Sequence, residues 1–343
     1  MRTKTRMRMG KIRELHLFAG IGGGIYGGYL LGHECCGGVE IDEFCQKVLK
    51  QKMADRWLKE FPLYGDITKL DGYGFRGTFD VLCGGFPCQA FSSAAHGLNK
   101  AEKNLWGEMF RFVQQSEAPV VFGENVTFVA IDKARKDLES VGYKVHVCKL
   151  SCEQLGGDHQ RMRFWLLAVK DYNVFEKVAK NIAGLPKLSN NCWHFPYLGY
   201  TVPVKEDRKA RLKAIGNAQS PIVAATAFVV LVNRHRSQNT PDIAVSQEEL
   251  DKVFITKRSW IKAEFGDDFG LVHTPTTMAN YSCPYMMRHK CCRNFVKVFD
   301  KPTPENAEYL MGFPPAASLA SPATDVWLFN WRNNIYASRK NHD

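Results

Sequence analysis

The sequence predicts an α/β fold with a doubly wound, mostly parallel sheet, followed by a smaller irregular domain. Three observations lead to this prediction. Between residues 12 and 170, short apolar runs alternate with stretches that carry apolar residues at helical spacing. The first apolar run passes into a glycine-rich turn and then a helical stretch, LFAGIGGG at 17–24. From about residue 172 the alternation is lost, and 235–320 mixes loops, proline and short strands.

The first four elements follow from glycine turns and helical spacing. Residues 14–20, ELHLFAG, form an apolar run that ends in a glycine turn, so we expect a strand there, and 24–32 continues as a helix. Residues 35–41, CCGGVEI, predict the second strand, which ends in an acid. Residues 43–61 predict a helix, because apolar side chains recur at helical spacing. These side chains are Phe44, Val48, Leu49, Met53, Trp57 and Leu58.

The later elements repeat the same rhythm. Further strands are expected over 79–85, 119–125, 143–150 and 163–169. Helices are expected over 105–115 and 129–142, the second closed by Gly142. Residues 215–232, IGNAQSPIVAATAFVVLV, turn and then become an apolar helix. We see no apolar run that approaches the 18 or more residues of a membrane span, so no membrane association is expected.

Composition favours a polyanionic partner and a reducing compartment. The chain has 343 residues and a formal charge of +11, with basic clusters near the amino terminus, at 208–213 and at 287–297. Solvated basic faces are the alternative explanation for any one cluster. The 11 cysteines are an odd number and show no disulfide framework. No signal-type apolar core follows the basic start, so we expect the protein in the cytoplasm, or in a host cell's cytoplasm if it is viral.

Polar groups at successive strand ends predict a nucleoside site. The glycine turn at 17–24, Glu40 and Asp66 follow the first three predicted strands. An acid at the end of the second strand of such a fold typically binds ribose hydroxyls. The glycines do not fall as G-x-G-x-x-G, so the three features suit S-adenosylmethionine better than NAD. Taken alone, the glycine turn is better explained as an ordinary strand-to-helix turn.

A thiol, a carboxyl and an arginine pair are expected at the same sheet edge. Cys88 follows a predicted strand, and Glu124 ends another. Arg161 and Arg163 directly precede the strand FWLLAV. Carboxyl ends of strands line the ligand crevice of open α/β sheets, so these groups could converge over one site. Each has a structural alternative: a buried packing thiol, a helix cap, or surface arginines.

Together these segments resemble the motifs of the cytosine-C5 DNA methyltransferase family. LFAGIGG, GGFPCQAFS, GENV and the HQRMRFWLLA segment occur in that family's order, and RLKAIGNAQSP is similar to its late glycine-asparagine motif. The match spans roughly residues 14–227, with one more island at 306–314, NAEYLMGFP. The resemblance implies a Rossmann-like S-adenosylmethionine-dependent methyltransferase fold with a smaller irregular target-recognition domain, and the layout resembles compact, phage-type members.

The resemblance also implies a role for each matching residue. Cys88 would attack C6 of the target cytosine, Glu124 would hydrogen-bond the ring at N3 and N4, and Arg163 would contact the flipped base near O2. Arg161 would support that site or a phosphate. Cofactor contacts are expected from Phe18, Ala19, Gly20, Gly22, Gly23, Glu40, Ile41, Asp66, Ile67, Pro87 and Asn217. DNA contacts are expected from Gln89, Ser92, Arg288, Lys290 and Arg293, and 92–104 looks like the family's mobile loop.

The sequence departs from the family pattern in two places. His159 stands where the family usually has glutamine, and IGNAQSP precedes YLMGFP, whereas the usual order is the reverse. We therefore expect a catalytic S-adenosylmethionine-binding domain over 1–172, a connecting segment and returning helix over 173–230, and a DNA target-recognition domain over 231–343.

The sequence also allows alternatives to duplex-DNA methylation. A tRNA cytosine-C5 methyltransferase would use the same fold. A non-catalytic DNA-binding module would keep the fold without turnover, although intact Cys88, Glu124 and Arg163 argue against it. A zinc site at Cys283, His289, Cys291 and Cys292 fits no standard spacing, so no metal is expected. We expect double-stranded DNA as partner and a monomeric enzyme. A cognate restriction endonuclease that acts separately is compatible with the hypothesis of a monomeric DNA methyltransferase.

Overall fold

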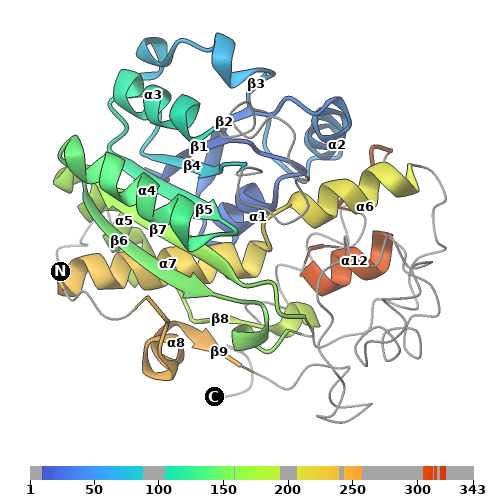
Figure 1. Cartoon of the computed structure of the whole chain (residues 1–343). Helices are drawn as coiled ribbons and strands as arrows, with labels where there is room; N and C mark the ends of the chain where they lie inside the picture. The colour runs from blue at the N-terminus through green and yellow to red at the C-terminus, as the bar shows by residue number, and fades with distance from the viewer. Residues whose placement is uncertain are drawn as a thin grey trace, which may run out of the picture.

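The computed structural model describes residues 10–87, 105–157, 159–193, 207–238, 243–256, 304–311, 313–314 and 317–321 (Figure 1). Its centre is a seven-stranded sheet in the order β3-β2-β1-β4-β5-β7-β6. The strands are β1 Arg13–Leu17, β2 Glu34–Val39, β3 Leu63–Tyr64, β4 Val81–Gly85, β5 Val120–Asn125, β6 Lys144–Leu150 and β7 Arg163–Val169. β7 runs antiparallel to both of its neighbours, and the pairs among β1 to β5 are parallel. The predicted doubly wound, mostly parallel sheet is thereby confirmed.

The reversed strand β7 determines which residues share a sheet edge. Its first residues pair with the last residues of β5, Phe164 with Asn125 and Trp165 with Glu124. The start of β7 therefore lies at the same edge as the carboxyl ends of β1, β2, β4 and β5. This places Arg163 beside Glu124, although 39 residues of sequence separate them (163 minus 124).

Helices cover both faces of the sheet. They are α1 Gly23–Leu30, α2 Glu43–Ala54, α3 Trp106–Ser116, α4 Phe128–Ser140, α5 Tyr172–Ala183, α6 Arg208–Asn217 and α7 Pro221–Ser237. Helices α1, α2, α5 and α7 share one apolar core with Val81 and Cys83 of β4. Helices α3 and α4 form the other core with Leu82 of the same strand. The alternation of side chains along a strand thus supplies both cores.

Two helical regions of the structure differ from the prediction. α2 ends at Ala54 rather than continuing to 61, because Arg56 takes a left-handed conformation, φ 60°, and Trp57 packs back under Lys52. α5 was not predicted. Its N-terminus is capped by Asp171, and its buried residues Phe175, Val178, Ala179 and Ile182 have the spacing of an amphipathic helix. The loss of β-α rhythm expected at 172 therefore begins after this helix.

No long apolar segment was expected, but the α6–α7 region is one, and it is the only one among the described residues. Arg208–Ser237 is long and apolar enough to cross a membrane, but 89% of its most apolar window is buried inside the protein. α7 contacts α1, β6 and β7. It has the burial of a core helix.

Parts of the predicted recognition domain pack against the α/β body. α8 Gln247–Val253 contacts α7, and β9 Phe254–Ile255 pairs in parallel with β8 Leu188–Ser189. α12 Pro304–Met311 packs against α6. The short 3-10 helices are η1 Ile67–Lys69, η2 Gly72–Phe75, η4 Glu153–Leu155 and η5 Asn191–Trp193. The predicted domain boundaries stay a prediction, but these pieces of 231–343 belong with the α/β body. Each cysteine in the described part of the chain is a free thiol.

Candidate active site

A cavity of about 1170 Å³ opens at the carboxyl edge of the sheet. It lies where β1, β2, β4 and β5 end, β7 begins and α6 closes in from the late part of the chain. Eleven of the predicted site residues line it: Phe18, Ala19, Gly20, Glu40, Ile41, Asp66, Ile67, Pro87, Glu124, Arg163 and Asn217. Gly22, Gly23 and Arg161 are placed near this edge but do not line the cavity. The predicted strand ends therefore do converge on one site.

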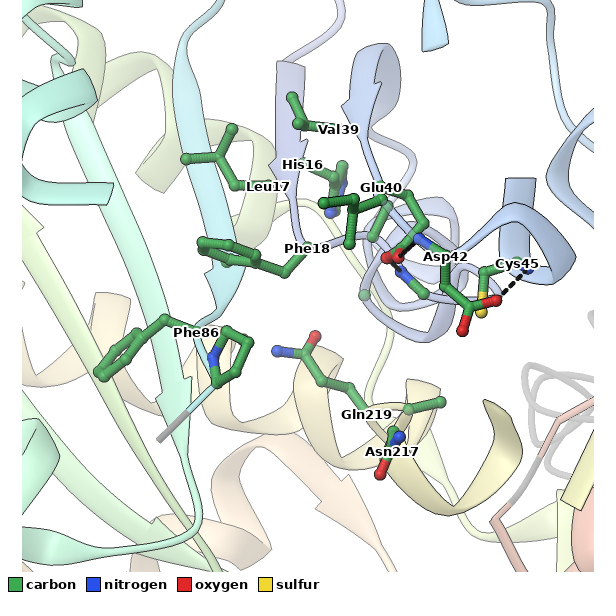
Figure 2. A pocket seen from close by; sticks show the side chains of 18 of the residues that line it. His16, Leu17, Phe18, Val39, Glu40, Asp42, Cys45, Phe86, Asn217 and Gln219 are labelled. Atoms are coloured by element: carbon green, nitrogen blue, oxygen red, sulfur yellow. Dashed lines mark hydrogen bonds between the residues drawn. The ribbon is translucent and has the colours of Figure 1, made fainter. Parts of the chain in front are cut away.

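The turn after β1 is shaped by left-handed backbone. Gly20 and Gly22 have φ of 55° and 90°, and Phe18 is also left-handed, with φ of 55°. A non-glycine residue in this region is uncommon and tends to be tolerated where function requires it. The Phe18 side chain lies at the cavity between Phe86 and the Glu40 segment (Figure 2).

Glu40 ties this turn to the end of β2. Its Oε2 accepts a hydrogen bond from the Gly20 N–H at 2.6 Å, and its Oε1 accepts one from the Asp42 N–H at 2.8 Å. Burial raises the pKa of Glu40, and the backbone hydrogen bonds oppose that shift. The carboxyl is thus held in place at the cavity wall, with lone pairs left to accept from a ligand hydroxyl.

The far end of the cavity combines an acid with apolar side chains. Asp66 Oδ1 accepts hydrogen bonds from the Thr68 N–H at 2.9 Å and from Thr68 Oγ1 at 2.8 Å, which lowers the Asp66 pKa. Ile41 is 67% exposed, and Ile67, which directly follows Asp66 in the sequence, also lines the cavity. Exposed apolar surface beside an acceptor suits a flat heteroaromatic ring with an amino group.

Glu124 and Arg163 form an ion pair at the other end. Arg163 Nε lies 3.2 Å from Glu124 Oε1, and both side chains are largely buried. The neighbouring Asn125 has a different role, because its Nδ2 donates to the Phe86 carbonyl oxygen at 2.9 Å. That bond fixes the chain just before Pro87, the last described residue before Cys88. The strand end β5 therefore positions both the acid and the segment that carries the thiol.

Arg161 does not line the cavity but binds two residues that do. Its Nη2 donates to the carbonyl oxygens of Gly216, at 2.9 Å, and Ala218. The side chain is buried, and this burial, with the nearby charge of Arg163, lowers its pKa to about 9. A guanidinium with that pKa is still charged at neutral pH. The arginine holds the loop between α6 and α7 rather than touching a ligand in the cavity.

His159, in the place of the family's glutamine, is fully buried. Neither ring nitrogen has a hydrogen-bond partner among the described residues. Burial and the charges of Arg161 and Arg163 hold its pKa well below the ordinary value, so the ring is neutral. Its place in this structure is that of a packing residue beside the arginine pair.

Lys213 and Gln219 are among the cavity-lining residues that sequence reasoning did not predict. Lys213 of α6 reaches Asp42 at 3.0 Å across the cavity mouth. Gln219 donates from Nε2 to Glu124 Oε2 at 3.4 Å. The signal for Gln219 was present in the GNAQSP segment, but only a tertiary contact shows that this glutamine, besides Asn217, enters the site.

Several predicted residues lie outside the described part of the chain. These are Cys88, Gln89, Ser92, Arg288, Lys290 and Arg293, together with the predicted loop at 92–104 and the cysteine and histidine set at 283–292. Their roles stay predictions.

Known proteins with similar sequences are methyltransferases. The chain is 31% identical over 208 residues to the type II methyltransferase M.CviJI of Paramecium bursaria Chlorella virus IL3A, which covers 58% of this chain and 52% of that protein. It is 30% identical over 172 residues to M.MspI of Moraxella sp., covering 47% and 39%. The chain thus spans about half the length, or less, of these curated relatives.

Solved structures include a prophage-encoded DNA modification methyltransferase of E. coli, described as putative. It is 17% identical to this chain, with a TM-score of 0.46, and covers 95% of this chain and 99% of that one. The family model for C-5 cytosine-specific DNA methylases matches residues 12–267, about three quarters of the sequence. The matched range contains the whole cavity and both of its charged ends. The chain belongs to the C-5 cytosine-specific DNA methylase family.

Proposed function

We propose that this chain is a DNA (cytosine-5-)-methyltransferase that acts on a cytosine flipped out of duplex DNA. The observation that carries the proposal is the Glu124 and Arg163 pair, which shares one cavity with the Glu40 turn. Pro87, which directly precedes Cys88 in the sequence, also lines this cavity. The Glu40 turn, which we propose binds the nucleoside, and the Glu124–Arg163 pair, which we propose binds the base, therefore line a single cavity.

The residues present fit S-adenosylmethionine, the methyl donor that membership of this family implies. Glu40 would accept from the ribose hydroxyls, and Asp66 with Ile41 and Ile67 would hold the adenine. The turn at 17–24 brings no basic side chain to the cavity. This donor set suits a nucleoside without a pyrophosphate. When bound, the cofactor supplies a methyl group on a sulfonium sulfur.

The chain's own residues prepare the base. The Cys88 thiolate would add to C6, forming a sulfur–carbon bond, while Glu124 supplies a proton at N3. The C5–C6 electron pair is then available at C5, which is otherwise a poor nucleophile. After the methyl group is in place, loss of the C5 proton, departure of the thiolate and return of the N3 proton to Glu124 would restore the neutral aromatic ring. Arg163 would orient Glu124 and meet the base near O2.

A cytosine in a duplex reaches this cavity only when it leaves the stack. Base flipping costs a few kcal/mol, which contacts to the flipped ring and the opened duplex must offset. The positive charge of the chain supports a duplex partner, because neutralised phosphates release counterions. We therefore expect duplex affinity to fall steeply as salt rises. We propose a monomeric enzyme, with any cognate endonuclease acting separately.

Covalent trapping tests the proposal. Duplex DNA containing 5-fluorocytosine should give a denaturation-resistant complex with the protein and cofactor, because fluorine at C5 blocks the final elimination. Cys88→Ser should abolish the complex, whereas Cys36→Ser, on β2 away from the cavity, should leave it intact. A parallel arm with tRNA separates the RNA alternative. Folded, cofactor-binding protein that traps neither substrate would overturn the proposal and favour a non-catalytic module.

A further inference from the structure

The two oxygens of Glu124 each have their own donor. Arg163 Nε lies 3.2 Å from Oε1, and Gln219 Nε2 donates to Oε2 at 3.4 Å. Gln219 comes from the junction of α6 and α7, 95 residues further along the chain than Glu124. Figure 2 shows its side chain projecting into the cavity on the side where Phe86 lies. The carboxyl is therefore held from both sides.

Glycines define the path of Gln219. A Cβ atom at Gly23 would lie 2.2 Å from the Gln219 carbonyl oxygen, and one at Gly24 would lie 2.6 Å from its Oε1. A Cβ atom at Gly85 would lie 2.9 Å from both Gln219 Nε2 and Glu124 Oε2. The absence of a side chain at Gly23 thus makes room for the Gln219 backbone, and its absence at Gly24 and Gly85 makes room for the amide of the Gln219 side chain.

Arg161 fixes the loop from which Gln219 projects. Its Nη2 donates to the carbonyl oxygens of Gly216 and Ala218, the residues just before Gln219. On the other side, Ser220 Oγ donates to the Met311 carbonyl oxygen at 2.8 Å. The loop is thus anchored immediately before and after the glutamine. The two arginines of the Arg-x-Arg segment converge on Glu124, Arg163 directly and Arg161 through the loop.

We propose that Gln219 is a positioning residue that orients the Glu124 carboxyl toward the target base, and that Arg161 acts through it. The inference rests on the proposed role of Glu124. A carboxyl that must meet N3 and N4 together needs a fixed plane, and two donors from opposite sides prevent rotation about the terminal side-chain bond. Gln219 also lines the cofactor cavity, so it connects the two halves of the site.

Steady-state kinetics on duplex DNA test the role of Gln219. Gln219→Met keeps the length and removes the amide, so kcat should fall about ten- to a hundredfold, the range of a hydrogen bond to a charged group. KM for DNA and the Kd for S-adenosylmethionine should stay near the wild-type values, a split that mere unfolding would not give. Gln247→Met, on exposed α8, is the matched control. Wild-type kcat in Gln219→Met would overturn the inference.

A double-mutant cycle tests the route through Arg161. Arg161→Lys keeps a charge and one donor, which limits loss of stability. If Arg161 acts through Gln219, adding Arg161→Lys to Gln219→Met should cost little more than Gln219→Met alone. Losses that multiply would show that the arginine acts by another route.

A measurement without turnover separates this inference from the proposed function. The side-chain amide NMR signal of Gln219 should shift in Glu124→Gln and stay unchanged in Glu248→Gln on exposed α8. A shift in a protein that does not methylate DNA would support the contact and overturn the proposed function alone. An unmoved signal in an active enzyme would overturn the inference alone.

Discussion

Glu124 lies in the buried strand β5, and it is the acid on which the proposed base-binding half of the site depends. It is 8% exposed, and Arg163 is its ion-pair partner. A buried carboxyl of this kind is stable because it is paired and hydrogen-bonded. Its charge and its ability to hold a proton are both required by the proposed chemistry.

Glu124→Gln keeps the shape of the side chain and removes its acid–base function. We expect kcat for methyl transfer to fall about 10²–10⁴-fold, the usual contribution of a general acid or base. Cofactor affinity, measured by calorimetry, should be preserved, because the proposed cofactor-binding residues Glu40 and Asp66 lie at the other end of the cavity. Glu248→Gln is the control. Retention of activity in Glu124→Gln would contradict the role given to this carboxyl.

Gly23 should tolerate no side chain. Gly23→Ala would place Cβ 2.2 Å from the Gln219 carbonyl oxygen, so backbone must move. We expect a loss of about 1–3 kcal/mol in unfolding free energy from overpacking, with weakened cofactor binding. Gly107→Ala is a matched control, because a Cβ atom there meets nothing within 4 Å and the site is helical. Equal denaturation midpoints for the two variants would contradict this packing.

Site residues could be predicted from the sequence where they lie at the ends of strands. Glu40, Asp66 and Glu124 each follow or end a strand, so the sheet alone brings them to one edge. Arg161 and Gln219 could not be placed in this way. Their positions depend on a loop that returns from a remote part of the chain, and sequence spacing does not report such a contact.

At the element scale, the late motif island forms a helix that docks onto α6. Arg211 Nη2 of α6 lies 3.2 Å from Glu308 Oε1 of α12, and both side chains are almost fully buried. Tyr26 of α1 meets Phe313 edge-on, with ring centroids 6.0 Å apart. The reversed motif order is therefore compatible with one packed body, because α12 returns to the helix that carries the earlier motif.

Breaking this buried pair should be costly. Glu308→Ala leaves the Arg211 guanidinium buried without its carboxylate, so we expect about 3–5 kcal/mol of destabilisation in chemical denaturation. Glu248→Ala removes an exposed pair with Lys252 and should cost less than about 1 kcal/mol. Similar losses in both variants would mean that α12 is not docked as described.

Elements were predictable where periodicity was strong. The strands and α1 to α4 follow from apolar runs and helical spacing. The direction of β7 was not predictable, because pairing direction is decided by neighbours and crossovers rather than by the strand's own residues. α5 was missed although its apolar stripe is regular, because the surrounding sequence becomes irregular soon after it.

At the scale of the whole molecule, buried titratable groups predict acid sensitivity. Burial, with the charges of His146 and Lys144, lowers the pKa of His235 to about 4. Burial disfavours the charged form of Glu14, but interactions with His33 and His16 outweigh it and lower the Glu14 pKa to about 2. Both groups bind protons more readily in the unfolded chain, so the folded state loses stability as pH falls.

The two groups act in adjoining pH windows. The His235 contribution is complete above about pH 6.5 and is lost as pH falls toward 4, whereas that of Glu14 is lost from about pH 4.5 toward 2. We expect His235→Gln to flatten the pH dependence of unfolding free energy between pH 6.5 and 4 by up to about 2 kcal/mol, allowing for screening. Urea denaturation across this range measures it. An unchanged slope would contradict the assignment.

We propose above all that the protein methylates cytosine at C5 in duplex DNA, with its active site in the cavity at the sheet edge. Bisulfite sequencing of duplex DNA incubated with the full chain and S-adenosylmethionine tests it most directly. We expect protected cytosines at a recurring sequence with wild-type protein, and none with Cys88→Ser. Fully converted DNA after incubation with folded, cofactor-binding wild-type protein, across substrates of diverse sequence, would contradict it.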